Sequence, residues 1–234
     1  TQTGVLVLAG PRSRDVLQKL TDIDLSNDSF KWLTGKKINV GFASAQALLV
    51  NFVGELGWEL HHPIEMQNYI FDQVMEAGAE FDIKPFGIRA MDSMRLEKSY
   101  RLIPREMSIE YSAYESGLDR FVRLDKENDF IGKEALKDWQ ERGAVNGFVT
   151  MEVLGIVDAD ARGSEAIYKD GMVVGRGTSG GYGWRCGKSL ALGIVRKDLT
   201  AVGTELEIEI LGEKYKSIVI DESPFDPNNE CLRS

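Results

Sequence analysis

Residues 51–62 read NFVGELGWELHH, and this stretch joins two strand-like segments through the GELG of residues 54–57. Glycine tolerates a positive φ and a close backbone approach, so the chain can bulge here and direct one side chain out of the sheet. The carboxylate of Glu55, with Phe52 and Trp58 near it, suits the two-donor edge of a flat heterocycle. A strand-connecting turn with a solvated glutamate explains the same residues, and both interpretations stay open.

The sequence around this stretch predicts an α+β domain. A buried strand is expected near the N-terminus, in GVLVLAG, and strands are expected on both sides of the GELG turn. Apolar residues at helical spacing predict four helices. These helices are expected to begin near Ser13, Pro63, Phe86 and Gly132.

The pattern changes after Gly143, where short strands replace helices. The Asp-Gly pair at 170–171 is a hairpin signal. In residues 205–210 glutamates alternate with leucine or isoleucine, which predicts a strand with one solvent-exposed and one buried face. We therefore expect an α+β domain over residues 1–143 and a small all-β sandwich or barrel over residues 144–234.

Composition narrows the function classes. The chain has 234 residues, of which 43% are hydrophobic and 28% are charged, with a formal net charge of −9. An acidic surface repels phosphate backbones and anionic lipid, so we expect neither nucleic acid nor membrane as a partner. No apolar run reaches the roughly 20 residues of a membrane span, and no signal peptide is recognisable. Two cysteines with no metal-type spacing fit a reducing, cytoplasmic compartment.

Two further groups of residues are candidates for ligand binding. In the helix expected over residues 86–98, Arg95 can hold a ligand carboxylate bidentately, or it can form surface pairs with neighbours such as Asp92. Residues 178–189, TSGGYGWRCGKS, read as a glycine-rich loop that carries Tyr182 and Trp184 and could close over a pocket. A glycine-rich hairpin end is the alternative.

Other side chains give little support for catalysis or metal binding. His61 and His62 are adjacent in a strand and point to opposite faces, so no metal site is expected. Neither has a nucleophile-like setting, which argues against Ser-His or Cys-His chemistry. Cys186 lies near Arg185 and Lys188, which would lower its thiol pKa, unless it is simply a loop thiol.

Five motifs follow one another along the chain: LAGPRSRDVLQKLTD, FVGELGWELHHP, GIRAMDSMRLEKSYR, DFIGKEAL and TSGGYGWRCGKSLALGIV. Their order and spacing resemble those of the glycine-cleavage T-protein (aminomethyltransferase) superfamily. The resemblance covers essentially the whole chain, and the motifs are most similar to the folate-binding C-terminal part of dimethylglycine and sarcosine dehydrogenases.

The resemblance implies the C-terminal two-thirds of a T-protein-like folate-binding fold, an antiparallel sheet with helices followed by a β-barrel. It implies transfer of a one-carbon unit from an N-methyl amine donor to tetrahydrofolate. By motif, Glu55 matches the glutamate that binds the pterin, Phe52 an aromatic near it, and Trp184, with Tyr182 beside it, the loop that approaches the folate cavity. FAD is expected only in a separate upstream domain. Localisation would then be cytoplasmic, or the mitochondrial matrix in a eukaryote.

Two departures from the family pattern matter. Met91 stands where the stand-alone T-protein has an arginine, and Arg95 matches a second, more structural arginine. The family's first segment, with its catalytic aspartate, is expected to precede Thr1, so no catalytic residue is assigned within this chain. The expected partners therefore include that segment or a flavin domain. Alone, the chain should bind folate weakly and turn over little.

The resemblance leaves two alternatives. A folate-dependent methyltransferase of the sulfonium-demethylating kind shares the fold and cofactor. Non-catalytic folate modules of the iron–sulfur assembly type carry a cysteine in a K-G-C-Y-x-G-Q-E signature, and the corresponding SYRLIPREM of residues 99–107 has none. The sequence thus favours a one-carbon-transfer domain.

Overall fold

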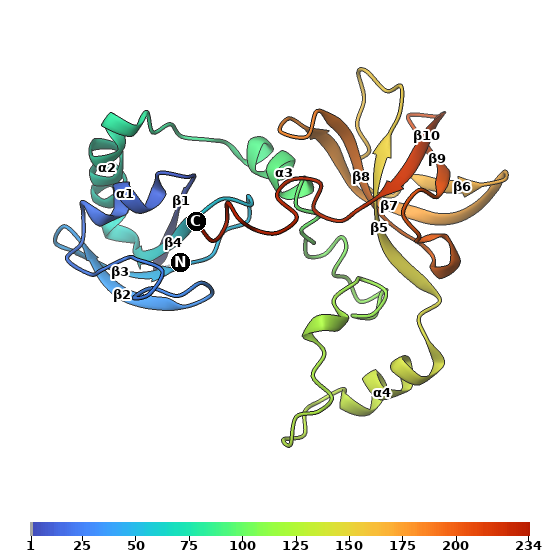
Figure 1. Ribbon diagram of the computed structural model, residues 1–234, viewed down its shortest axis with the longest axis horizontal. Coiled ribbons are helices and arrows are strands. Elements are labelled where there is room, and N and C mark those ends of the chain that lie inside the picture. The colour runs from blue at the N-terminus through green and yellow to red at the C-terminus, as the bar shows by residue number, and fades with distance from the viewer. Residues whose placement is uncertain (1) are drawn as a thin grey trace. The chain divides into compact units, whose positions relative to one another are not determined.

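The computed structural model describes residues 2–234, and its contacts group them into two compact units (Figure 1). Unit 1 contains residues 2–92 together with Asp226–Ser234, and unit 2 is Ser93–Phe225. The boundary predicted between residues 143 and 144 concerns folding domains and stays a prediction.

Unit 1 is built on an antiparallel sheet with the strand order β1-β4-β3-β2. Alternating burial in β2 and β3 gives the sheet one dry face, as a period of two residues requires. The helices α1 and α2 pack together and against β1 and β4 on that face (Figure 1). The strands are β1 (Thr3–Ala9), β2 (Gly35–Val40), β3 (Ala43–Leu48) and β4 (Gly57–Pro63), and the helices are α1 (Ser13–Gln18) and α2 (Gln67–Gly78).

The core of unit 1 centres on Trp58 of β4, which is fully buried. Its ring and the ring of Phe30 are T-shaped, with a centroid distance of 6.3 Å and an interplanar angle of 82°. Leu17 of α1 and Ile70 of α2 close the same cluster. Burial of side chains of this size contributes about 2 kcal/mol each, so this core fixes the sheet beneath the two helices.

The helix predicted to begin at Pro63 starts later than expected. β4 runs to Pro63, a 3₁₀ turn η1 (Ile64–Met66) follows, and α2 begins at Gln67. It ends at Gly78 as predicted, and a second 3₁₀ turn η2 (Ala79–Phe81) follows. A Cβ on Gly78 would lie 2.6 Å from Ile83, so glycine lets the returning chain pack against the helix end.

Unit 2 is built on a closed antiparallel barrel with the order β10-β5-β8-β7-β6-β9 (Figure 1). The predicted turn at Asp170 and Gly171 is confirmed, with φ values of 52° and 76°. The predicted alternation of exposed and buried faces over residues 205–210 is confirmed too. The strands are β5 (Asn146–Val153), β6 (Ala166–Lys169), β7 (Met172–Gly183), β8 (Lys188–Arg196), β9 (Glu205–Ile210) and β10 (Glu213–Ile220), with the 3₁₀ turn η4 (Lys197–Leu199).

Two helices and a 3₁₀ turn precede the barrel. They are α3 (Ile88–Leu96), η3 (Asp119–Phe121) and α4 (Lys133–Arg142). The helix predicted over residues 86–98 is shorter at both ends, and Ser99 shortly after it has a φ of 54°. The predicted fold class, an antiparallel sheet with helices followed by a small β-barrel, is confirmed.

Candidate functional site

The GELG stretch ends the connection between β3 and β4, and its Gly57 is the first residue of β4. The side-chain Oδ1 of Asn51 accepts hydrogen bonds from the backbone N–H of Val53 at 2.9 Å and of Gly54 at 3.1 Å. The Asn51 amide also donates to the main-chain oxygen of Glu55. Gly54 has a φ of 74°, so it occupies the left-handed region that glycine enters without strain. The predicted positive φ is therefore confirmed.

The turn is fixed against the edge of unit 1 where β1 meets α1. The carbonyl of Leu56 accepts hydrogen bonds from the N–H of Gly10 at 2.8 Å and from Ser13 Oγ at 3.0 Å. A Cβ on Gly57 would lie 2.5 Å from the carbonyl oxygen of Leu8, so the predicted close backbone approach is also confirmed. Residue 55 is thus held in place from both sides.

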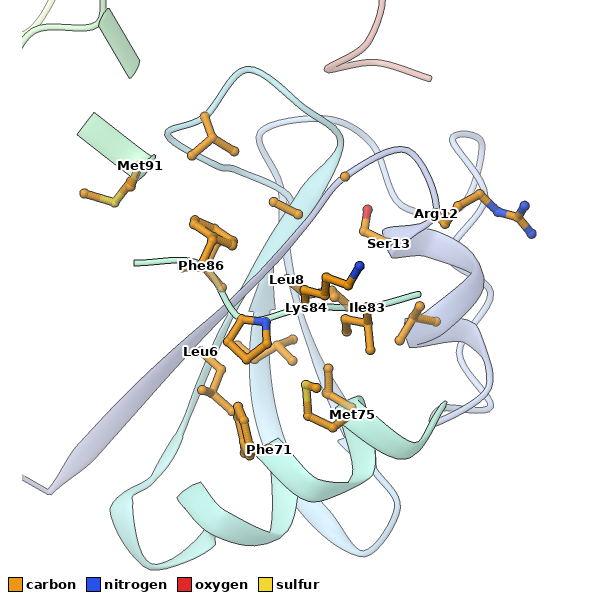
Figure 2. Close-up of a pocket in the computed structure, with 18 of the residues that line it drawn as sticks. Leu6, Leu8, Arg12, Ser13, Phe71, Met75, Ile83, Lys84, Phe86 and Met91 are labelled. Atoms are coloured by element: carbon orange, nitrogen blue, oxygen red, sulfur yellow. The ribbon is translucent and has the colours of Figure 1, made fainter. Parts of the chain in front are cut away.

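A cavity of about 800 Å³ opens beside this turn. Its walls are β1, α2, the extended segment 82–87 and the start of α3, and they are mostly apolar (Figure 2). Figure 2 shows Leu6, Phe71 and Met75 gathered on one side of the cavity, while Arg12 points away from it. This size and lining are typical of a small-molecule pocket.

Of the two predicted ligand-binding residues of unit 1, Phe52 is among the described residues that line the cavity and Glu55 is not. Phe52 and Val53 of the turn line it, and so does Met91 of α3, where the family resemblance expects an arginine. Glu55 is half-buried and is not one of the described residues that line the cavity, although Val53, two positions earlier, is. The ligand-binding roles of Phe52 and Glu55 stay predictions.

Arg95 lies in unit 2 and is fully buried, so the surface-pair interpretation is wrong. Its Nη1 donates to the carbonyl of Tyr100 at 3.2 Å and lies 3.8 Å from the carboxylate of Glu106. Glu106 is buried too and accepts hydrogen bonds from Thr178 Oγ1 at 2.6 Å and Ser179 Oγ at 2.5 Å. Arg95 therefore belongs to an internal network that ties α3 to β7, and its contact with a ligand stays a prediction.

Tyr182 and Trp184 lie at the tip of the β7–β8 hairpin. The expectation of a loop over residues 178–189 is wrong in part, because β7 continues to Gly183 and the connection is only residues 184–187. Trp184 is 79% exposed and Tyr182 is 40% exposed. Their ring centroids lie 4.9 Å apart at an interplanar angle of 74°. The alternative, a glycine-rich hairpin end, describes this region, and it presents an aromatic pair to solvent.

Sequence reasoning missed a group of buried charges in the segment that follows α3. Glu97 and Lys98 are buried, as is Arg101, whose guanidinium pairs with Glu222 and lies 3.7 Å from the ring centroid of Phe148. Lys98 Nζ donates to the carbonyl of Phe225 at 3.2 Å. The dense charges of RLEKSYR were the only sequence signal of this buried group, and such runs usually indicate a solvent-exposed face instead.

The hypothesis that neighbouring cations lower the pKa of Cys186 is wrong. Burial, followed by the nearby negative charge of Glu97, raises the pKa of the Cys186 thiol to about 11. The positive charges of Arg185 and Lys188 lower the pKa of this thiol, but their effect is smaller than the increase from burial and Glu97. The thiol is therefore protonated at neutral pH and is a poor nucleophile.

His61 and His62 point to opposite faces, as predicted. His62 is buried, with Nε2 2.9 Å from the side-chain oxygen of Gln67, whereas His61 is half-exposed with Nε2 3.0 Å from Glu59. Within residues 2–234 no group of three or more His, Cys, Asp or Glu side chains could hold a metal ion. No helix of that same range is long and apolar enough to cross a bilayer.

Comparison with known proteins decides the family. Residues 1–126 match the family described as the GCVT N-terminal domain, which is more than half of the chain. Residues 147–226 match the glycine cleavage T-protein C-terminal barrel domain. The chain belongs to the glycine-cleavage T-protein family. The family resemblance inferred from the five motifs is therefore confirmed.

Within this family the chain is related to two mitochondrial dehydrogenases. It is 43% identical to human dimethylglycine dehydrogenase over 94% of its own length and 25% of the relative's. It is 34% identical to mouse sarcosine dehydrogenase over 98% of its own length and 26% of the relative's. The chain thus spans about a quarter of these enzymes. It is an aminomethyltransferase-type domain related to them.

A solved structure supports the fold of this family member. The glycine cleavage system aminomethyltransferase T from Bartonella henselae superimposes with a TM-score of 0.81. The match covers 96% of this chain and 60% of that one, at 21% sequence identity. The sheet, helices and barrel are therefore the family fold.

Proposed function

We propose that this chain is a tetrahydrofolate-binding domain for one-carbon transfer, the folate module of a dimethylglycine or sarcosine dehydrogenase-like protein. Its membership of the T-protein family and its kinship with these dehydrogenases support the proposal. The observation that carries it is the cavity of about 800 Å³ beside the glycine-flanked turn of Glu55.

The residues of unit 1 fit a flat, hydrogen-bonding ligand. The apolar walls, with Phe52 and Met91 among them, suit the face of a reduced pterin. The pterin edge presents an amino group and a ring N–H, and a carboxylate can accept both at once. In this proposal Glu55 accepts these two hydrogen bonds, and its fixed backbone orients the ligand.

Unit 2 carries the other residues that we propose for folate binding. Tyr182 and Trp184 offer exposed ring surface to the rest of the folate, since aromatic faces stack on flat groups. Arg95 would act through the network that it shares with Glu106. No acid or base of the chain is assigned a catalytic role.

In a dehydrogenase-like protein of this kind, folate bound here would accept the one-carbon unit released from an oxidised N-methyl amine, giving methylenetetrahydrofolate. FAD would belong to another domain, where the amine is oxidised. Because both relatives are named as mitochondrial, we propose the mitochondrial matrix for a eukaryotic protein of this type. The chain on its own is expected to turn over little.

Calorimetric titration tests the proposal. The purified chain is titrated anaerobically with tetrahydrofolate and, in parallel, with p-aminobenzoylglutamate, which lacks the pterin. We expect tetrahydrofolate to bind saturably, with a dissociation constant above micromolar. Its affinity should be well above that of p-aminobenzoylglutamate. Equal binding of both ligands, or no binding up to about millimolar concentration, contradicts the proposal.

A further inference from the structure

The β7–β8 hairpin tip combines strong exposure with firm anchoring. Residues 184–187 connect two strands paired up to Gly183 and Lys188, and the tip closes with a hydrogen bond from Gly187 N–H to the carbonyl of Gly183 at 2.8 Å. A free tip of this kind is usually the most mobile part of a hairpin. Here it meets the end of α3, so its position is set by contacts beyond the hairpin.

Glu97 is the centre of this anchoring. Its Oε1 accepts hydrogen bonds from the backbone N–H of Arg185 at 2.6 Å and of Cys186 at 3.2 Å. Its Oε2 accepts a hydrogen bond from the Nε of Arg185. The Glu97 side chain is 1% exposed, and the Arg185 side chain is 22% exposed. One buried carboxylate therefore holds both the main chain and a side chain of the tip.

Neighbouring contacts reinforce the same position. Ser93 Oγ donates to the carbonyl of Tyr182 at 2.6 Å, and Arg185 Nη2 donates to the carbonyl of Met94 at 3.1 Å. A Cβ on Gly183 would lie 2.9 Å from Glu97 Cγ, so glycine is what allows the hairpin to approach this closely. The last turn of α3 thus forms hydrogen bonds with residues on both sides of Trp184.

Burying a carboxylate is costly, and a pair of hydrophobic residues would often stabilise the fold as well. What a carboxylate adds is direction, because its acceptor sites fix the N–H groups that they bind. The groups fixed here are next to an aromatic pair that is left exposed. This arrangement orders the tip without covering it.

We propose that Glu97 is a positioning residue that fixes the β7–β8 tip and thereby holds Trp184 and Tyr182 ready for the ligand. The inference rests on the proposed function only for the identity of that ligand. Binding to a fixed tip avoids the cost of ordering two aromatic side chains at the moment of association. Glu97 itself need not touch the ligand.

The test uses the whole chain labelled with 5-fluorotryptophan. Its four tryptophans give four ¹⁹F resonances, and W184F assigns the one of interest. E97Q keeps the size of the side chain but places an amide donor opposite the Arg185 Nε donor. We expect the Trp184 resonance to shift and broaden in E97Q while the resonances of Trp32, Trp58 and Trp139 stay in place. The affinity for tetrahydrofolate is expected to fall about tenfold.

Two further variants keep the test decisive. E115Q alters another buried carboxylate of unit 2, which binds Ser112 and Asn146, so it controls for a general loss of stability. It should lower the melting temperature without moving the Trp184 resonance. S93A removes a single hydrogen bond from the tip and should broaden the Trp184 resonance even if E97Q fails to fold.

The outcomes separate the two proposals. An unchanged Trp184 resonance in both E97Q and S93A, or an equal shift in E115Q, overturns the role of Glu97. If the resonance responds as expected but the wild-type chain binds no tetrahydrofolate, the anchoring stands and the proposed function fails. If wild type binds and E97Q binds equally well, the anchoring does not serve the ligand and the inference is wrong.

Discussion

Each glycine that flanks Glu55 has a structural reason of its own. Gly54 takes a left-handed φ in the Asn51 turn, and Gly57 lets β4 lie against the backbone of β1. The turn uses the main-chain oxygen of Glu55, not its carboxylate, as the acceptor for the Asn51 amide. The fold of the turn therefore does not explain the choice of a carboxylate side chain at position 55, whereas the proposed contact with a pterin does.

Glu55→Gln should weaken the binding of tetrahydrofolate. Glutamine keeps the size of the side chain but offers one acceptor and one donor, so one pterin N–H would face an N–H. We expect the loss to be about 2 kcal/mol, which weakens tetrahydrofolate binding roughly 30-fold. Calorimetric titration of the variant beside the wild type measures it.

Glu65→Gln is the matched control, because Glu65 is an exposed glutamate of unit 1 in the 3₁₀ turn η1, after β4 and away from the turn at Asn51. It should bind like the wild type and melt at the same temperature. If the Glu55 and Glu65 variants bind tetrahydrofolate equally, the carboxylate of Glu55 has no part in recognition.

Cys186 supports a prediction on pH. With its pKa raised to about 11, the thiol is about one part in a thousand thiolate at pH 8, against roughly a quarter for an ordinary cysteine. Iodoacetamide should therefore label Cys186 far more slowly than N-acetylcysteine at pH 8, and the rate should climb steadily as the pH approaches 11. Peptide mass spectrometry follows the labelling. A rate at pH 8 equal to that of N-acetylcysteine would show that the thiol is not held protonated.

At the scale of elements, the β1–β4 contact depends on Gly57. Gly57→Ala places a methyl group 2.5 Å from the carbonyl oxygen of Leu8, so strand and turn must separate. We expect a loss of about 2–3 kcal/mol in the free energy of unfolding, measured by urea denaturation. Gly87→Ala is the control, because its added methyl meets nothing within 4 Å, and it should change stability by less than about 1 kcal/mol. Similar losses in both variants would mean that close approach is not what glycine provides at position 57.

Periodicity predicted the elements whose surroundings are regular. The alternation in β9 and the helix α4 in GKEALKDWQERG follow from local pattern alone, and both are present. The stretch TSGGYGWRCGKS was wrongly predicted to be a loop throughout, because most of its glycines lie within strand β7. A Cβ on Gly180 would lie 2.6 Å from the carbonyl oxygen of Ala161, a contact that local sequence does not reveal.

The candidate site was predictable only in part for a similar reason. Phe52 and Glu55 could be singled out because glycines mark their turn. The buried network of Arg95, Glu97 and Glu106 could not, because charged residues are rarely buried and their partners are remote in sequence. Burial of a charge is decided by tertiary contacts such as those from Thr178 and Arg185.

For the whole molecule, acidity predicts which partners it avoids. A net charge of −9 should prevent retention on heparin or on phosphatidylserine vesicles at physiological salt. Affinity chromatography and vesicle flotation measure this directly. Salt-sensitive retention on either anionic surface would contradict the expectation that neither nucleic acid nor membrane is a partner.

The most direct test of the account is a crystal structure of the chain with 5-formyltetrahydrofolate, a stable analogue of the ligand. We expect the pterin in the cavity of unit 1, with its amino group and ring N–H within about 3 Å of the Glu55 carboxylate and its face on Phe52. A pterin bound elsewhere, with the Glu55 carboxylate turned to solvent, would contradict it.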